Sequence, residues 1–179
     1  MIRMVAPLLI FLGLVWLLLI SLPTAEQRRQ VASPLIGREV PNFTLPCLLE
    51  PDTIYSTMEL RGQPFILNVW GSWCPSCVVE HPYITRLGRE ANVPLVGLNW
   101  RDERDDALAW INRFGDAWTM HMVDVEGMAA IDLGVYGAPE TFLIDHRGVI
   151  RHKHIGPVDA NSYGDLMNRI NEMRRDAGL

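Results

Sequence analysis

The order of strand-like and helix-like segments in this chain of 179 residues predicts a three-layer α/β fold with a mixed central sheet. The short apolar run Phe65–Trp70 is typical of a buried strand, and helical spacing begins a few residues after it. Further on, two strand-like runs are separated only by Asp145-His146-Arg147-Gly148, which is a hairpin signal. A hydrophobic content of 49% is ample for a core between the layers.

An apolar segment precedes the predicted domain. Met4–Leu22 contains no charged residue, and as a helix it is long enough to cross a bilayer core of about 30 Å. A cleaved signal peptide is the alternative, but the run exceeds a usual signal h-region and no clean small-x-small cleavage site follows it. We therefore expect a transmembrane signal anchor over residues 1–22, a linker over residues 23–37 and the folded domain over residues 38–179.

The first half of the domain alternates between extended and helical patterns. Asn42–Leu45 is a short extended segment, and the turn Leu60–Pro64 leads into the first buried strand. A helix is predicted over Cys74–Arg89, and Pro82 is expected to bend it because proline removes a backbone hydrogen bond. The apolar run Leu95–Trp100 predicts the next strand.

The second half completes the sheet. Near-helical spacing of apolar residues, with aspartates at its start, predicts a helix over Asp105–Phe114. A short strand, a brief helix, two hairpin strands and a terminal helix then follow over Met120–Asp124, Met128–Leu133, Thr141–Ile144, Val149–His154 and Asp159–Arg175.

Cys74-Pro75-Ser76-Cys77 lies where the first buried strand meets the first helix. Two thiols at this spacing can close a disulfide with each other and pass it to another molecule. The N–H groups and the dipole of a helix N-terminus favour the thiolate of the first cysteine. Zinc would need a second pair of ligands, and the remaining cysteine, Cys47, has no partner nearby. An inert structural disulfide is the other alternative, and we favour a redox site because of the strand-then-helix context.

Composition limits the partners and cofactors. A formal net charge of −5 gives no indication of a nucleic-acid partner. No metal site is expected, since His152 and His154 share a strand face but lack further ligands. No cofactor is expected beyond a redox-active Cys74–Cys77 disulfide.

Two motifs resemble those of the thioredoxin superfamily and, more closely, of the membrane-anchored thiol:disulfide interchange proteins of cytochrome c maturation, the CcmG/DsbE family. The first motif, over residues 68–77, reads Asn-Val-Trp-Gly-Ser-Trp-Cys-Pro-Ser-Cys and alone marks a thioredoxin-like redox protein. The second, over residues 134–145, contains Gly-Val-Tyr-Gly-Ala-Pro-Glu-Thr-Phe and is close to the family's signature. The similarity covers roughly Gly37–Met173, and Cys47 departs from the pattern.

The resemblance implies a thioredoxin-like fold and a division of roles between the cysteines. Cys74, expected to be the more exposed of the two, would be the nucleophile, and the buried Cys77 would resolve the mixed disulfide. Pro139 would be a cis-proline facing the disulfide, so that Ala138 can present its backbone to an extended substrate. The residues expected at the substrate surface are Trp73, Pro75, Tyr136, Ala138 and Pro139, although Trp73 and Tyr136 could also simply pack beside the site.

Two acids are candidates for adjusting the thiol pKa values. Glu80 follows Cys77 in the predicted helix, and Glu140 follows the proline. Acids near such sites often adjust thiol pKa values, but they also often face water. The alternatives are therefore a solvated helix residue for Glu80 and a strand-edge carboxylate for Glu140.

The resemblance further implies a thiol–disulfide oxidoreductase, anchored by a single pass in the inner membrane, with its redox domain in the periplasm. It would reduce apocytochrome c or a thiol protein that handles apocytochrome c, with electrons from a membrane thiol transporter. A non-catalytic apocytochrome-binding module with a structural disulfide, or a general periplasmic thiol oxidase or isomerase, are the alternatives. The direction of electron flow stays open, because the reduction potential depends on a few kcal/mol of thiolate stabilisation.

Overall fold

The computed structural model describes residues 2–21 and 34–179, and the chain divides into two compact units over residues 1–31 and 32–179. In the first unit, helix α1 spans Ile2–Ser21. A search of the described residues finds no helix that is both long and apolar enough to cross a membrane. The predicted linker falls largely on residues 23–33, which lie outside the described residues.

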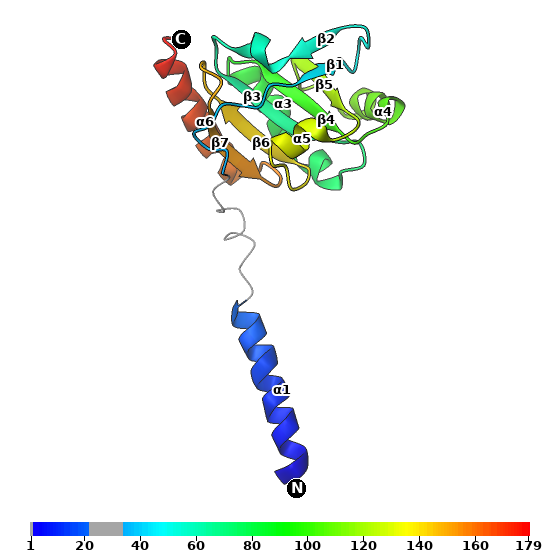
Figure 1. Cartoon of the computed structure of the whole chain (residues 1–179), viewed down its shortest axis with the longest axis vertical. Helices are drawn as coiled ribbons and strands as arrows, with labels where there is room; N and C mark the ends of the chain where they lie inside the picture. The colour runs from blue at the N-terminus through cyan, green and yellow to red at the C-terminus, as the bar shows by residue number, and fades with distance from the viewer. Residues whose placement is uncertain (1, 22–33) are drawn as a thin grey trace. The chain divides into compact units, whose positions relative to one another are not determined.

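The second unit is built around a five-stranded mixed sheet with the order β5-β4-β3-β6-β7 (Figure 1). The central strand β3 (Phe65–Trp70) pairs in parallel with β4 (Leu95–Trp100), which pairs in parallel with β5 (Met120–Asp124). On its other side β3 pairs antiparallel with β6 (Glu140–Ile144), which forms a hairpin with β7 (Ile150–Ile155). All residues of β3 are buried, as a strand covered on both faces requires.

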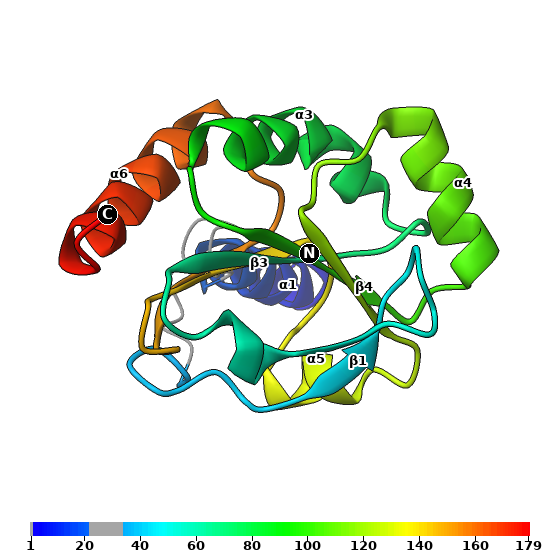
Figure 2. The same ribbon diagram turned by 90° about the horizontal axis from the view of Figure 1, so that it is seen from above.

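Helices cover both faces of this sheet (Figure 2). The helices α3 (Pro75–Glu90), α4 (Arg104–Phe114) and α6 (Ala160–Asp176) pack on one face, in a single core cluster with β3 and β4. The two crossovers β3-α3-β4 and β4-α4-β5 move the chain in the same direction, so the handedness rule puts both of their helices on one face. The shorter α5 (Met128–Asp132) lies on the opposite face, above a second core cluster.

Aromatic rings fill the core beneath α3. Trp70 stacks on Trp118 with ring centroids 4.5 Å apart, and it meets Trp110 at 5.0 Å. His81 packs edge-on against Trp110 at 4.7 Å. Gly97 of β4 leaves room for these rings, because a Cβ atom there would lie 2.8 Å from Trp118. The core therefore fixes α3, and with it the cysteine motif, against the sheet.

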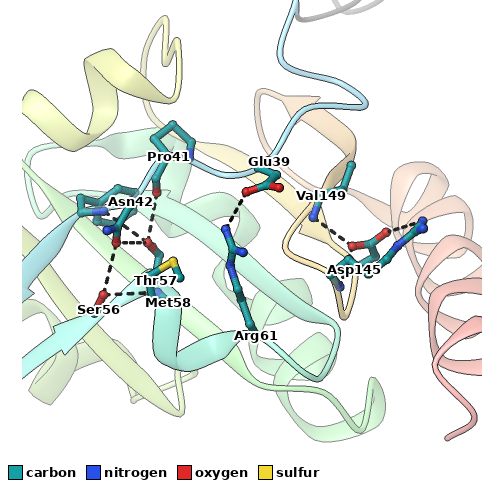
Figure 3. A network of polar contacts seen from close by, with 11 residues as sticks. Glu39, Pro41, Asn42, Ser56, Thr57, Met58, Arg61, Asp145 and Val149 are labelled. Carbon is teal, nitrogen blue, oxygen red and sulfur yellow. Dashed lines mark hydrogen bonds and ion pairs between the residues drawn. The ribbon is translucent and has the colours of Figure 1, made fainter.

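The segment that precedes β3 forms a small sheet and a 3₁₀ helix of its own. The strands β1 (Thr44–Pro46) and β2 (Ile54–Ser56) form a two-stranded antiparallel sheet, and the 3₁₀ helix η1 (Thr57–Leu60) follows. The hydroxyl of Thr57 donates to the Pro41 carbonyl at 3.1 Å (Figure 3). It also accepts the Phe43 N–H at 3.2 Å. These bonds hold the incoming chain on η1.

The predicted elements are confirmed with small shifts at their ends. The two strands that run parallel to β3, Leu95–Trp100 and Met120–Asp124, have the predicted bounds. The predicted helix over Cys74–Arg89 begins at Pro75, with Cys74 as its N-cap, and Pro82 lies inside it. β2 and η1 were not predicted, because a three-residue strand and a single turn are too short to show a periodicity.

Replacing the buried Thr57 by valine tests the attachment of the incoming segment. Thr57→Val keeps the shape but removes both hydrogen bonds, so the free energy of unfolding should fall by about 1–3 kcal/mol. Urea unfolding of the full chain in mild detergent, followed by tryptophan fluorescence, measures this change. The control is Arg61→Met, which breaks the exposed Arg61–Glu39 pair and should cost less than about 1 kcal/mol. Equal losses for the two variants would contradict the account.

Candidate functional site

The two cysteines of the motif form a disulfide at the N-terminus of α3. Cys74 and Cys77 are bonded to each other, with Cα atoms 5.3 Å apart. Cys74 is the N-cap residue, and its Sγ accepts the N–H of Cys77 at 3.1 Å. The same N–H also donates to the Cys74 carbonyl at 3.2 Å, so the sulfur and the carbonyl of the N-cap residue share this donor. After reduction, the same donor and the helix dipole favour a thiolate on Cys74.

The expectation that Cys74 is the more exposed cysteine is wrong for the disulfide form, since both cysteines are 2% exposed. The sulfur of Cys74 turns inward to accept the Cys77 N–H, and both residues belong to the core cluster that contains Trp70. Half-buried Ala138 packs against the same cluster. A difference in reactivity between the cysteines therefore has to come from their positions on the helix rather than from exposure in this form.

A buried carboxylate holds the loop that precedes Cys74. Asp102 accepts both the N–H and the hydroxyl of Ser72 at 2.6 Å, and the side-chain amide of Asn99 at 2.8 Å. Next to it, the Trp73 indole donates to the carbonyl of Trp100 at 3.1 Å. Sequence reasoning did not single out Asp102. The available signal was an acid just beyond the end of the strand next to β3, where sites in open α/β sheets form.

Glu80 is a buried acid on the helix that carries the cysteines. It is 1% exposed, so its interpretation as a solvated helix residue is wrong. Its carboxylate accepts the Asn68 amide and the Val158 N–H, each at 2.9 Å. Burial raises the pKa of Glu80 to about 7, although both hydrogen bonds act in the opposite direction. Because Glu80 lies three residues after Cys77, both side chains share one face of α3.

Asn68 joins this acid to the rest of the sheet. Its amide nitrogen donates to Glu80 and, at 3.2 Å, to the hydroxyl of Thr141 on β6. Its amide oxygen accepts the indole N–H of Trp118 at 3.1 Å. The side chain is fully buried with all its bonding groups used, so its orientation is fixed.

Glu140 is also buried, so its interpretation as a strand-edge carboxylate in water is wrong. Its carboxylate lies 3.0 Å from the Lys153 ammonium and accepts the Tyr136 N–H at 2.9 Å. Burial raises the pKa of Glu140, while the Tyr136 N–H and Lys153 act in the opposite direction. Lys153 was not predicted as a site residue, because in the polar run Arg-His-Lys-His it resembles a solvated residue.

The predicted substrate-contacting residues differ in exposure. Trp73, Pro75 and Tyr136 are exposed, Ala138 is half-buried and Pro139 is buried. The Ala138–Pro139 peptide is cis, as the resemblance implies. The contact of these residues with a substrate stays a prediction.

Within residues 34–179 no group of three or more His, Cys, Asp or Glu side chains is arranged to hold a metal. The third cysteine, Cys47, is a buried free thiol next to Tyr55. Burial, together with the neighbouring Cys47, raises the pKa of Tyr55. This thiol is not part of the Cys74–Cys77 disulfide.

The raised pKa of Glu80 predicts a pH-dependent stability. Because folding raises this pKa from 4.5 to about 7, the folded state binds the proton more tightly than the unfolded chain. The resulting stabilisation, about 3 kcal/mol, is fully present below the unfolded value and is lost as the pH rises to about 7. Urea unfolding of the oxidised protein between about pH 5 and 8 measures it.

Glu80→Gln serves as the reference protein, because the other titrating groups are the same in both. The free energy of unfolding of the wild type should fall relative to that of the variant as the pH rises. Parallel pH profiles for the two proteins would show that Glu80 keeps an ordinary pKa.

Known proteins share this sequence over most of its length. Residues 35–167 match the Redoxin family. A protein of Allochromatium vinosum named "Thiol:disulfide interchange protein DsbE" is 45% identical over 168 residues, which cover 94% of this chain and 92% of the relative. The protein of that name from Escherichia coli K12 is 41% identical over 157 residues, covering 86% and 84%.

Solved structures share the fold. A secreted Mycobacterium tuberculosis disulfide oxidoreductase, described as homologous to E. coli DsbE, superimposes with a TM-score of 0.62 at 21% identity, over 73% of this chain and 95% of the other. A secreted thiol-disulfide isomerase from Corynebacterium glutamicum superimposes with a TM-score of 0.63 at 24% identity, over 74% and 85%. This chain therefore belongs to the Redoxin family, as a DsbE/CcmG-type member of the thioredoxin superfamily with the thioredoxin-like α/β fold.

Proposed function

We propose that this chain is a thiol–disulfide oxidoreductase that works as a membrane-anchored reductase during cytochrome c biogenesis. The observation that carries the proposal is the position of Cys74, whose sulfur caps α3 and accepts the Cys77 N–H at 3.1 Å. A structural disulfide has no need of such donors, whereas a nucleophile gains from them because they stabilise the thiolate. Relatives named as thiol:disulfide interchange proteins support the same chemistry.

The reaction consists of two exchanges. In the reduced protein the Cys74 thiolate attacks one sulfur of a substrate disulfide, forms a mixed disulfide and releases one substrate thiolate. The Cys77 thiolate then attacks the Cys74 sulfur, which closes the Cys74–Cys77 disulfide and releases the second substrate thiolate. The protein loses two electrons, the substrate gains them, and two protons from solvent or nearby acids complete the substrate thiols.

Glu80 is suited to take part in this proton balance. Its carboxyl shares a helix face with Cys77, and its pKa of about 7 lets it exchange a proton near neutral pH. We propose that Glu80 takes up the proton of the Cys77 thiol as that residue becomes the attacking thiolate.

The N-terminal segment supports the proposed anchoring, and the resemblance to membrane-anchored proteins supports the proposed location. Met4–Leu22 is free of charge, and its described large side chains, including Phe11, Trp16 and Leu19, are exposed on α1. An uncharged apolar sequence of this length supports insertion into a bilayer. We propose a single pass through the inner membrane with the redox domain in the periplasm.

The proposed substrate is the disulfide of apocytochrome c or of a thiol protein that handles it. A membrane thiol transporter would restore the reduced form by supplying two electrons to the Cys74–Cys77 disulfide. The close match of residues 134–145 to the signature of the cytochrome c maturation proteins supports this assignment. No nucleic-acid partner is proposed.

Insulin reduction driven by dithiothreitol tests the cysteine roles. Cys74→Ser should lower the catalysed rate by about a hundredfold or more, because the variant loses the thiol at the N-cap of α3, where the thiolate is favoured. Cys47→Ser is the matched control, and it should stay within about twofold of the wild type because Cys47 lies outside the disulfide. Turnover by the Cys74 variant would disprove its role as nucleophile.

Trapping identifies the substrate. Cys77→Ser removes the resolving thiol, so mixed disulfides through Cys74 should accumulate in membranes and release their partners on reduction. Mass spectrometry of the released proteins should find apocytochrome c or a thiol protein of its maturation. Capture of unrelated proteins alone would refute the cytochrome c assignment and leave the exchange chemistry intact.

A further inference from the structure

Lys153 is a buried cation of β7, opposite Phe142 of β6. Its side chain is 1% exposed, and its ammonium donates to the Gly134 carbonyl at 2.7 Å. The same ammonium lies 3.0 Å from the Glu140 carboxylate and 4.1 Å from the centre of the Tyr136 ring. Sequence reasoning gave Lys153 no role, and the exchange chemistry does not use it.

Stability alone does not account for this ion pair. Removing two charges from water is costly, and buried pairs can often be replaced by apolar residues without loss of stability. Lys153 instead contacts three residues of one short segment, namely Gly134, Tyr136 and Glu140. That segment includes the turn from Gly134 to Pro139, which we call the proline loop.

Glu140 completes the attachment of the proline loop from the other side. Its carboxylate accepts the backbone N–H of Tyr136, while Lys153 lies against the ring of that residue. The pair is fixed in two neighbouring strands, since Lys153 lies opposite Phe142 in the register and Glu140 is two residues from Phe142 on the same face. The proline loop is thus held to the rigid sheet through both the backbone and the ring of Tyr136.

The proline loop contacts the core cluster to which the disulfide belongs. Ala138 packs against the core cluster that contains Cys74 and Cys77, and Glu140 pairs in register with Val69 on β3. Tyr136 is 64% exposed, so its ring covers Lys153 on one side and faces solvent on the other. A polypeptide that reaches Cys74 would meet the proline loop, whereas a small disulfide needs access to the sulfur alone.

We propose that Lys153 is a positioning residue for polypeptide disulfides, because it holds Tyr136 and the proline loop in the arrangement that an extended substrate requires. The proposal rests on the proposed oxidoreductase function and adds a residue that separates polypeptide disulfides from small ones. In this proposal the Glu140–Lys153 pair holds the loop that receives the substrate, and it does not alter the reactivity of the thiols.

Two probes that differ in size test the proposal. The pre-reduced full-length protein in detergent is mixed with insulin or with 2-hydroxyethyl disulfide, and its oxidation is followed by stopped-flow fluorescence. Lys153→Met should slow the reaction with insulin by roughly ten- to a hundredfold, the size of effect expected when a binding loop is displaced. The rate constant with 2-hydroxyethyl disulfide should stay within about twofold, because Cys74 itself is unchanged.

A matched control comes from the same strand. Arg151→Met removes a cation of β7 that pairs with Asp145 away from the proline loop, and both of its rate constants should match the wild type. If Lys153→Met does not fold, the neutral pair Glu140→Gln with Lys153→Met takes its place, and the same selective loss with insulin is expected. An equal loss with both probes, or no loss with insulin, would overturn the proposal.

A double-mutant cycle tests whether Lys153 acts through Tyr136. Tyr136→Ala should lose reactivity with insulin, and adding Lys153→Met should cause little further loss. If the double variant shows the product of the two single losses in rate, Lys153 and Tyr136 act independently, and the inference is refuted. A wild type that reacts with neither probe would instead refute the oxidoreductase function itself.

Discussion

The rest of the site depends on one buried amide, that of Asn68 in the central strand. It donates to Glu80 on α3 and to Thr141 on β6, and it accepts from Trp118 before β5. Leaving any of these buried groups without a partner costs about 1–3 kcal/mol, so the helix and both strands are held in one arrangement. Helix α3 carries Cys77, and β6 follows Pro139. The Asn68 amide therefore fixes the positions of both the disulfide and the proline loop relative to β3.

Three buried carboxylates of this domain have separate tasks. Asp102 holds the loop before Cys74 through Ser72, and Glu140 holds the proline loop together with Lys153. Glu80 has no cationic partner among its hydrogen bonds, and its pKa is raised to about 7. Glu80, whose pKa lies near neutral pH, is thus fitted to exchange a proton, whereas Asp102 and Glu140 position backbone.

Sequence patterns predicted the parts of this fold that follow from local periodicity. Buried apolar runs gave β3 and β4 with their bounds, and the strand-to-helix change placed Cys74 at the start of α3. The roles of Asp102 and Lys153 could not be predicted, because each depends on a partner from another element and hence on strand register. The burial of Cys74 was missed for a related reason, since the packing of Trp70 and Ala138 is a tertiary property.

The central claim is that the N-terminus of α3 makes Cys74, and not Cys77, the reactive thiolate. Alkylation of the reduced protein with a limiting amount of iodoacetamide near neutral pH, followed by peptide mass mapping, tests it most directly. The account predicts rapid modification of Cys74, with Cys77 slower by at least about tenfold, because the thiolate is the species that reacts. Equal rates for the two cysteines, or faster modification of Cys77, would contradict it.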